Sequence, residues 1–144
     1  MKKLMTIFFT IMFLTACSKT TNHNYMFNGE SEHWEAEYTY NGTEKWVEND
    51  GQKKYSNEDN DRFILKYKGS LKELSSLQKI EYSYETTSGS GRVAEEFTEP
   101  PSTGIFSSSG GSKGGAKVGE DEVIKVHVKW DDLEESFELH NNTN

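Results

Sequence analysis

Alternation of apolar and polar residues, broken only by Ile64, runs through three separate segments of the chain, residues 34–40, 62–68 and 79–85. A period of two is typical of a β-strand with one face packed and the other in water. The apolar members are Trp34, Ala36, Tyr38 and Tyr40, then Phe63, Leu65 and Tyr67, then Ile80, Tyr82 and Tyr84. The pattern therefore predicts three strands whose packed faces are rich in aromatic rings.

The clearest strand pairing is expected near the C-terminus, where residues 124–130 and 133–139 alternate on either side of an Asp-Asp pair. A two-residue turn there sets apolar residues opposite apolar ones and Lys opposite Glu. The expected pairs are Trp130 with Leu133, Val126 with Phe137, Ile124 with Leu139, Lys129 with Glu134, His127 with Ser136 and Lys125 with Glu138. Only Glu135, opposite Val128, breaks the pattern, and we expect it to lie at an edge or to reach a Lys or Tyr of another strand.

A second turn is predicted at Asn41-Gly42, because Asn-Gly is a strong hairpin signal. A three-residue loop would place Trp46 opposite Tyr38, whereas a two-residue turn would place it opposite Glu37. The first register is favoured, because aromatic pairs across a strand ladder are stabilising.

The segments between these strands are polar. Residues 48–61 are expected to form a turn-rich loop. Its Glu58, Asp59 and Asp61 are possible calcium ligands, but the residue order of an EF-hand is absent, so we expect a solvated loop. Leucines spaced by three in residues 71–77 predict one short helical turn.

Residues 86–121 are rich in Gly and Ser, which predicts long flexible loops with little to bury. Within them, residues 105–106 are expected to dock as a brief edge strand. Loops of this length in a small domain are usually functional or disordered. The functional alternative is a binding loop whose basic contacts are Arg92, Lys113 and Lys117.

Many short strands with turn signals and little helix predict an all-β fold, an antiparallel β-sandwich of immunoglobulin-like architecture with a long Gly/Ser-rich loop. The expected division is a signal peptide at 1–16, a lipidated cysteine and polar tether at 17–28, a single domain at 29–140 and a tail at 141–144.

The N-terminal leader has the order of a secretory signal, with Lys2 and Lys3 before an apolar run that is too short to span a bilayer comfortably. It ends in Leu-Thr-Ala-Cys, which matches a bacterial lipobox. We therefore expect cleavage before Cys17 and a diacylglycerol or other acyl lipid, such as palmitate, on its sulfur. Cleavage elsewhere with release, or a short uncleaved anchor, are the alternatives.

Charge narrows the range of partners. The chain carries 16 basic and 24 acidic side chains, and without Lys2 and Lys3 its net charge is near −10. Such a surface repels nucleic acid and anionic lipid headgroups, so no nucleic-acid partner is expected. Cys17 is the only cysteine, which excludes a disulfide within the chain and leaves an unpaired thiol that lipidation would explain.

No catalytic motif is present in the sequence. There is no GxSxG elbow, and the only cysteine is assigned to lipid. His23, His33, His127 and His140 are scattered without an HExxH order, and we interpret them as surface or strand histidines. We therefore expect no enzyme activity, no metal site and no cofactor beyond the lipid on Cys17.

Four motifs together resemble small uncharacterised lipoproteins of Bacillus-type Gram-positive bacteria. They are GESEHW at 29–34, LKYKGSL at 65–71, IEYSYE at 80–85 and VKWDDLEESFEL at 128–139. The resemblance implies a lipid-anchored β domain at the cell membrane, facing outside the cytoplasm, and implies no known activity. The expected role is a non-catalytic binding or accessory module for an envelope protein or polymer. The alternative is an immunity-like lipoprotein that sequesters a toxin at the membrane.

Overall fold

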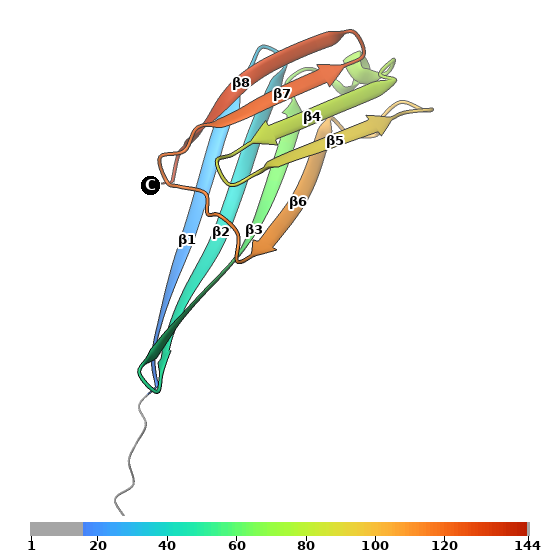
Figure 1. Cartoon of the computed structure of the whole chain (residues 1–144). Helices are drawn as coiled ribbons and strands as arrows, with labels where there is room; N and C mark the ends of the chain where they lie inside the picture. Colours follow the sequence, from blue (N-terminus) through green and yellow to red (C-terminus); the bar gives the residue numbers. More distant parts are fainter. Residues whose placement is uncertain (1–15, 144) are drawn as a thin grey trace, which may run out of the picture.

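Eight antiparallel strands and one short 3₁₀ helix make up the computed structural model, which describes residues 16–143 (Figure 1). The elements are β1 (Cys17–Glu30), β2 (Trp34–Asn49), β3 (Gln52–Tyr67), η1 (Leu71–Leu74), β4 (Lys79–Glu85), β5 (Ser90–Glu96), β6 (Ile105–Lys113), β7 (Ile124–Trp130) and β8 (Leu133–Asn141). The all-β prediction is confirmed. The predicted signal peptide, apart from Ala16, lies outside the described residues.

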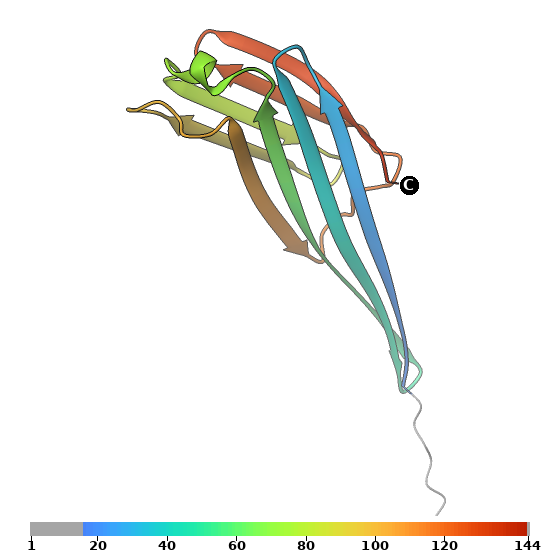
Figure 2. The same cartoon turned by 180° about the vertical axis from the view of Figure 1, so that it is seen from behind.

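The strands form a single nearly closed sheet in the order β5-β4-β7-β8-β1-β2-β3-β6. Its two halves meet at β1 and β8, which share only two residue pairs, Phe27 with Asn141 and Asn28 with His140. In Figures 1 and 2 the half formed by β4, β5, β7 and β8 lies across the upper part of the half formed by β1, β2, β3 and β6. The antiparallel arrangement is as predicted, while the immunoglobulin-like sandwich stays a prediction.

The core lies between the two halves and is built from the alternating faces that the sequence marks. Trp34 is fully buried, with its ring centroid 5.5 Å from Trp130 and 5.1 Å from Tyr67. Phe63 stacks on Tyr84 at 4.9 Å. These rings come from both halves of the sheet. The halves are therefore held together by aromatic packing in addition to the β1–β8 pairing.

The β7–β8 hairpin has the predicted register in all six predicted pairs. Burial is uneven, however, because Leu133 is 57% exposed while Leu139 is fully buried. Of the two expectations for Glu135, the edge position is met, because β8 pairs with β1 only at His140 and Asn141, whereas the contact with a Lys or Tyr is wrong. The Glu135 carboxylate accepts hydrogen bonds from Ser31 and His33 in the turn between β1 and β2.

The predicted turn at Asn41-Gly42 is wrong, because β2 runs straight through it. The chain reverses at Asp50-Gly51, where both residues have positive φ, 50° and 75°, as a tight hairpin requires. The glycine at position 42 is explained by packing, since a Cβ there would lie 2.8 Å from the Tyr40 hydroxyl. Trp46 therefore lies opposite Tyr55, and neither predicted register for it is correct.

The expected tether at 17–28 and the expected loop at 48–61 are also wrong, because both are strand. β1 pairs with β2 from Cys17 to Glu30, and β2 pairs with β3 down to the Asp50-Gly51 turn. We call residues 17–24 and 43–57 the stalk, and residues 25–42 and 58–143 the body. Figure 1 shows β1, β2 and β3 continuing beyond the body to the narrow end of the molecule. Cys17 is exposed there.

The Gly/Ser-rich segment 86–121 is more ordered than predicted. It contains β5 and β6, and β6 extends the expected edge strand at 105–106 as far as Lys113. Two of its glycines make room for neighbouring side chains, since a Cβ on Gly91 would lie 2.4 Å from the Tyr84 ring and one on Gly110 would lie 2.7 Å from the Asp61 carboxylate. The predicted helical turn is confirmed as η1, with Leu74 buried beneath it.

Candidate functional site

A pocket of about 310 Å³ lies where the Gly/Ser segments meet at the stalk side of the body. We call it the Tyr–Asp pocket. Its lining residues are Tyr38, Tyr40, Asp59, Asp61, Tyr84, Thr86, Ser88, Gly89, Ser90, Gly110, Gly111, Ser112, Gly115 and Ala116. The alternation of β2, β3 and β4 sets the tyrosines and aspartates on the inner face, while the β4–β5 turn and the end of β6 supply the small residues.

Hydrogen bonds fix the carboxylates of this pocket. The Tyr84 hydroxyl donates to Asp61 Oδ2 at 3.0 Å, and the Tyr40 hydroxyl to Asp59 Oδ2 at 3.4 Å. Ser112 donates from its backbone N and its Oγ to Asp59, each at 3.0 Å. Burial, followed by the nearby aspartate charge, raises the pKa of Tyr40 and of Tyr84 to about 12. Both phenols therefore stay protonated donors at neutral pH.

The Tyr–Asp pocket is suited to a donor-rich ligand. Carboxylate and hydroxyl side chains line it, and no Lys, Arg or His of residues 16–143 does. Such a lining favours ligands with hydroxyl or ammonium groups and disfavours phosphate or sulfate. The charge of this pocket is negative, whereas the binding loop that the sequence predicts is basic.

The three predicted basic contacts lie apart. Arg92, on edge strand β5, has its guanidinium 3.6 Å from Glu81. Lys113 ends the opposite edge strand β6, opposite Glu58 in the ladder. Lys117 Nζ lies 2.6 Å from Glu44 Oε1. The structure therefore does not bring these residues together into one binding surface.

Glu44 instead gathers a polar cluster at the junction of stalk and body. Its carboxylate accepts hydrogen bonds from Lys117 Nζ at 2.6 Å and from the Tyr55 hydroxyl at 2.7 Å, and pairs with His23 Nε2 at 2.6 Å. The Lys117 bond, followed by those of Tyr55 and His23, lowers the pKa of Glu44 to about 2. The cluster ties the 114–123 segment to the stalk. No sequence signal marks it, because its members are far apart in the chain.

A second polar cluster closes the opposite end of the body. His33 Nδ1 lies 2.5 Å from Glu135 Oε1, and Ser31 Oγ donates to the same carboxylate. Burial opposes ionisation of Glu135, but these hydrogen bonds outweigh it and lower its pKa. The hydrogen bond to Glu135 raises the pKa of His33. Glu32, His33 and Glu135 are the one group of three potential metal ligands within residues 16–143.

The geometry of this second cluster is that of an ion pair. The Ser31 hydroxyl donates to Glu135 and not to His33, so the nucleophile-to-base contact of a catalytic triad is missing among these described residues. His33 Nδ1 is occupied by the carboxylate, which leaves only Nε2 of this histidine as a possible metal ligand. The cluster joins β8 to the turn between β1 and β2.

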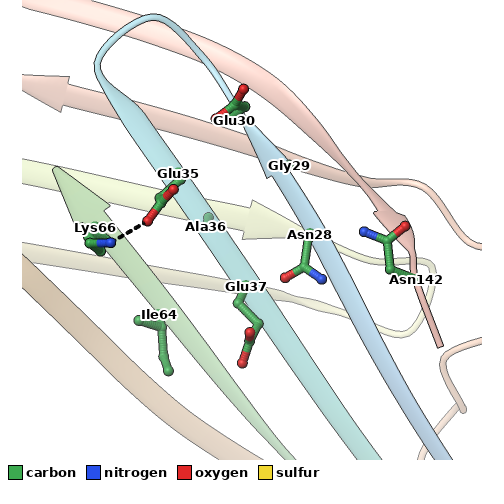
Figure 3. Close-up of a pocket in the computed structure, with 9 residues that line it drawn as sticks. All are labelled: Asn28, Gly29, Glu30, Glu35, Ala36, Glu37, Ile64, Lys66 and Asn142. Carbon is green, nitrogen blue, oxygen red and sulfur yellow. Dashed lines mark ion pairs between the residues drawn. The ribbon is translucent and has the colours of Figure 1, made fainter. Parts of the chain in front are cut away.

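A larger depression of about 530 Å³ lies over β1, β2 and β3 (Figure 3). Gly29 and Ala36, which face each other in the ladder, are among its lining residues. Figure 3 shows one ion pair, Lys66 with Glu35 at 2.7 Å, while Asn28 and Glu37 stand apart from it. No set of convergent groups marks this depression as a binding site.

Comparisons with models of protein families, with curated proteins and with solved structures give no significant match. The resemblance to Bacillus-type lipoproteins therefore stays a prediction. Among residues 16–143 no helix is long and apolar enough to cross a membrane.

Proposed function

We propose that the chain is a lipoprotein of the cell membrane, anchored through Cys17 on the outer side, and that its body is a non-catalytic binding module. The observation that carries this proposal is the exposure of Cys17 at the free end of the stalk. A lipidated residue must reach the bilayer while the folded domain stays in water. A cysteine at the tip of a protruding three-stranded ladder meets both requirements.

The anchor is tested in cells by labelling with radioactive palmitate and by mass spectrometry of the processed chain. The wild-type protein should carry label on Cys17 and begin at that residue. Cys17→Ala should accumulate as unlabelled precursor, whereas the neighbouring control Ser18→Ala should be processed and labelled normally. A labelled Cys17→Ala protein, or an intact leader in the wild type, would contradict the anchor.

The binding role is supported by the Tyr–Asp pocket, whose acceptor-rich lining fits a hydroxyl-bearing envelope polymer or a basic protein segment. Ser90 lines the pocket and is exposed, so Ser90→Trp should cover the opening without disturbing the core. Ser102, exposed in the loop between β5 and β6, provides a matched control.

The measurement is a pull-down from solubilised membranes and envelope fragments. A stoichiometric partner should be recovered with the wild type and with Ser102→Trp, and lost with Ser90→Trp. Equal recovery with all three proteins would exclude the pocket as the binding site. Recovery of no partner with the wild type would contradict the binding role.

The excess of negative charge favours one alternative, sequestration of a basic toxin at the membrane. The body carries 21 acidic and ten basic side chains, a field that attracts cationic partners. Cells that produce the wild-type protein should then survive a co-encoded basic toxin, and cells that produce Cys17→Ala should not. Equal killing of both would eliminate this alternative.

A further inference from the structure

The stalk carries a partly exposed aromatic pair, and the hydroxyl of its tyrosine donates to Glu44. Trp46 and Tyr55 lie opposite each other on β2 and β3, with ring centroids 4.8 Å apart, and are 47% and 42% exposed. The other tryptophans, Trp34 and Trp130, are buried in the core. Trp and Tyr side chains left at the surface are favoured at the boundary between lipid and water, where their rings contact acyl chains and their polar atoms stay hydrated.

Four lysines lie near this pair, two on its face of the ladder, Lys19 and Lys53, and two on the opposite face, Lys45 and Lys54. Lys19 lies opposite Trp46 in the β1–β2 ladder, and Lys53 and Lys54 lie on β3 beside the final turn. Lys45, next to Trp46 on β2, is the fourth. In the ladder every one of them is within three residue steps of Cys17, or about 10 Å at the rise of a strand.

The charge of the stalk is unlike that of the body. The stalk has four lysines against Glu44, Glu48 and Asp50, and Glu44 is already paired with Lys117. The body has about twice as many acidic as basic side chains. The stalk is therefore the part of the described molecule in which positive charge is in excess, and it is the part that bears Cys17.

We propose that the stalk end docks directly on anionic lipid headgroups, with Trp46 and Tyr55 at the interface and the lysines on the lipid phosphates. Its role in the cell rests on the proposed lipid anchor, but the contact itself needs no lipid on Cys17. Glu58, the acidic body residue nearest the tip in the ladder, pairs with Thr43 at the level of Asn22, which is roughly 17 Å from Cys17 along the strand. This exceeds the Debye length of about 8 Å at physiological salt, so the acidic body is screened from the anionic surface.

The test uses the chain from residue 17 onward with Cys17→Ser, which cannot be lipidated. All described strands and the whole buried core lie in this part of the chain, so it keeps the fold. The probe is a vesicle of phosphatidylglycerol and phosphatidylcholine, compared with pure phosphatidylcholine. We expect sedimentation with the anionic vesicles, a blue shift of tryptophan emission, and quenching by brominated lipid that Trp46→Phe abolishes, because Trp34 and Trp130 are buried.

Removing the lysines should weaken this partition by roughly fivefold for each charge lost. Lys19→Gln, Lys53→Gln and Lys54→Gln together should therefore lower it on the order of a hundredfold. The matched control Lys72→Gln, Lys125→Gln and Lys129→Gln removes the same charge from the body and should leave partition unchanged. Far-ultraviolet circular dichroism verifies that both variants are folded.

Three outcomes would overturn the proposal. The first is no sedimentation and no emission change of the unsubstituted chain with anionic vesicles. The second is equal loss of binding in the stalk and body lysine variants. The third is an emission shift that depends on protein concentration without vesicles, which would mean that a second copy of the chain covers Trp46. None of these depends on palmitate labelling, so the anchor and the lipid contact can fail separately.

Discussion

The body and the stalk are built from the same three strands, β1, β2 and β3, yet different interactions hold them. In the body these strands bury large aromatic side chains such as Trp34, Tyr38 and Phe63 against the other half of the sheet. In the stalk both faces are wet, and the strands are held by the backbone ladder, the Trp46–Tyr55 pair and the Glu44 cluster. A strand can therefore continue far beyond its core when neighbouring strands satisfy its hydrogen bonds.

This contrast predicts that one substitution has very different costs in the two regions. Val126→Asp buries a carboxylate at a site that is 2% exposed and should destabilise the body by about 4 kcal/mol or more, enough to unfold a small domain. Val47→Asp in the stalk, where the side chain is half-buried, should cost less than about 1 kcal/mol. Urea unfolding followed by tryptophan fluorescence measures both, and equal costs would break the distinction.

The contact between β1 and β8, where the two halves of the sheet meet, is expected to be the next most sensitive to substitution. A Cβ on Gly29 would lie 2.0 Å from the backbone oxygen of Glu138, which cannot move aside like a side chain. Gly29→Ala should therefore cost about 2–3 kcal/mol. Gly89→Ala is the control, because no atom lies within 4 Å of its Cβ and it should change stability by less than about 0.5 kcal/mol. Thermal unfolding of the two variants compares them, and a neutral Gly29→Ala would mean that the halves are not packed so closely.

The Glu44 cluster predicts a pH dependence confined to the stalk. The pKa of Glu44 is lowered from 4.5 to about 2, so its contribution is present above pH 4.5 and is lost as the pH falls toward 2. Hydrogen exchange of the stalk amides should therefore accelerate between these values, earlier than that of the body. Glu44→Gln should remove this step and leave fast exchange at every pH. A carboxyl titration of Glu44 with its midpoint near 4.5 would contradict the cluster.

The smallest effect is expected at the far end of the body. Because the pKa of His33 is raised above 6.5, its ion pair with Glu135 contributes below pH 6.5 and is lost as the pH rises through the folded-state pKa. His33 is 41% exposed, so the contribution should be below about 1 kcal/mol. Melting temperatures measured at pH 6 and 8 should differ slightly more for the wild type than for His33→Gln. An identical difference in both would show that the pair contributes nothing.

The same contrast explains how far the sequence could predict the fold. Alternation reports burial on one face, so it identified the body parts of β2 and β3, the strands β4, β7 and β8, and every predicted pair of β7 and β8. The stalk sequence, in β1 from Cys17 to Asn24 and around the Asp50-Gly51 turn, is polar at successive positions because neither face of these strands is buried. Its strands were therefore predicted as tether and loop.

The candidate sites were harder to predict than the strands. Gly and Ser near β5 and β6 indicated flexibility, whereas Gly91 and Gly110 are small because Tyr84 and Asp61 occupy the adjacent space. That reason is visible only once the strands are paired. Arg92 could be identified as exposed and basic from its sequence, but its partner Glu81 depends on how β4 and β5 align.

The central claim is that β1 is a stiff strand that holds Cys17 away from the body. Cys17 is the only cysteine, so one further cysteine at the exposed Glu32, beyond the far end of β1, allows a spin-label distance measurement in the unlipidated chain from residue 17. A strand from Cys17 to Glu30 spans about 44 Å, and the account predicts a single narrow distribution near or slightly above that value. A broad distribution centred at a clearly shorter distance would mean a flexible tether and would contradict it.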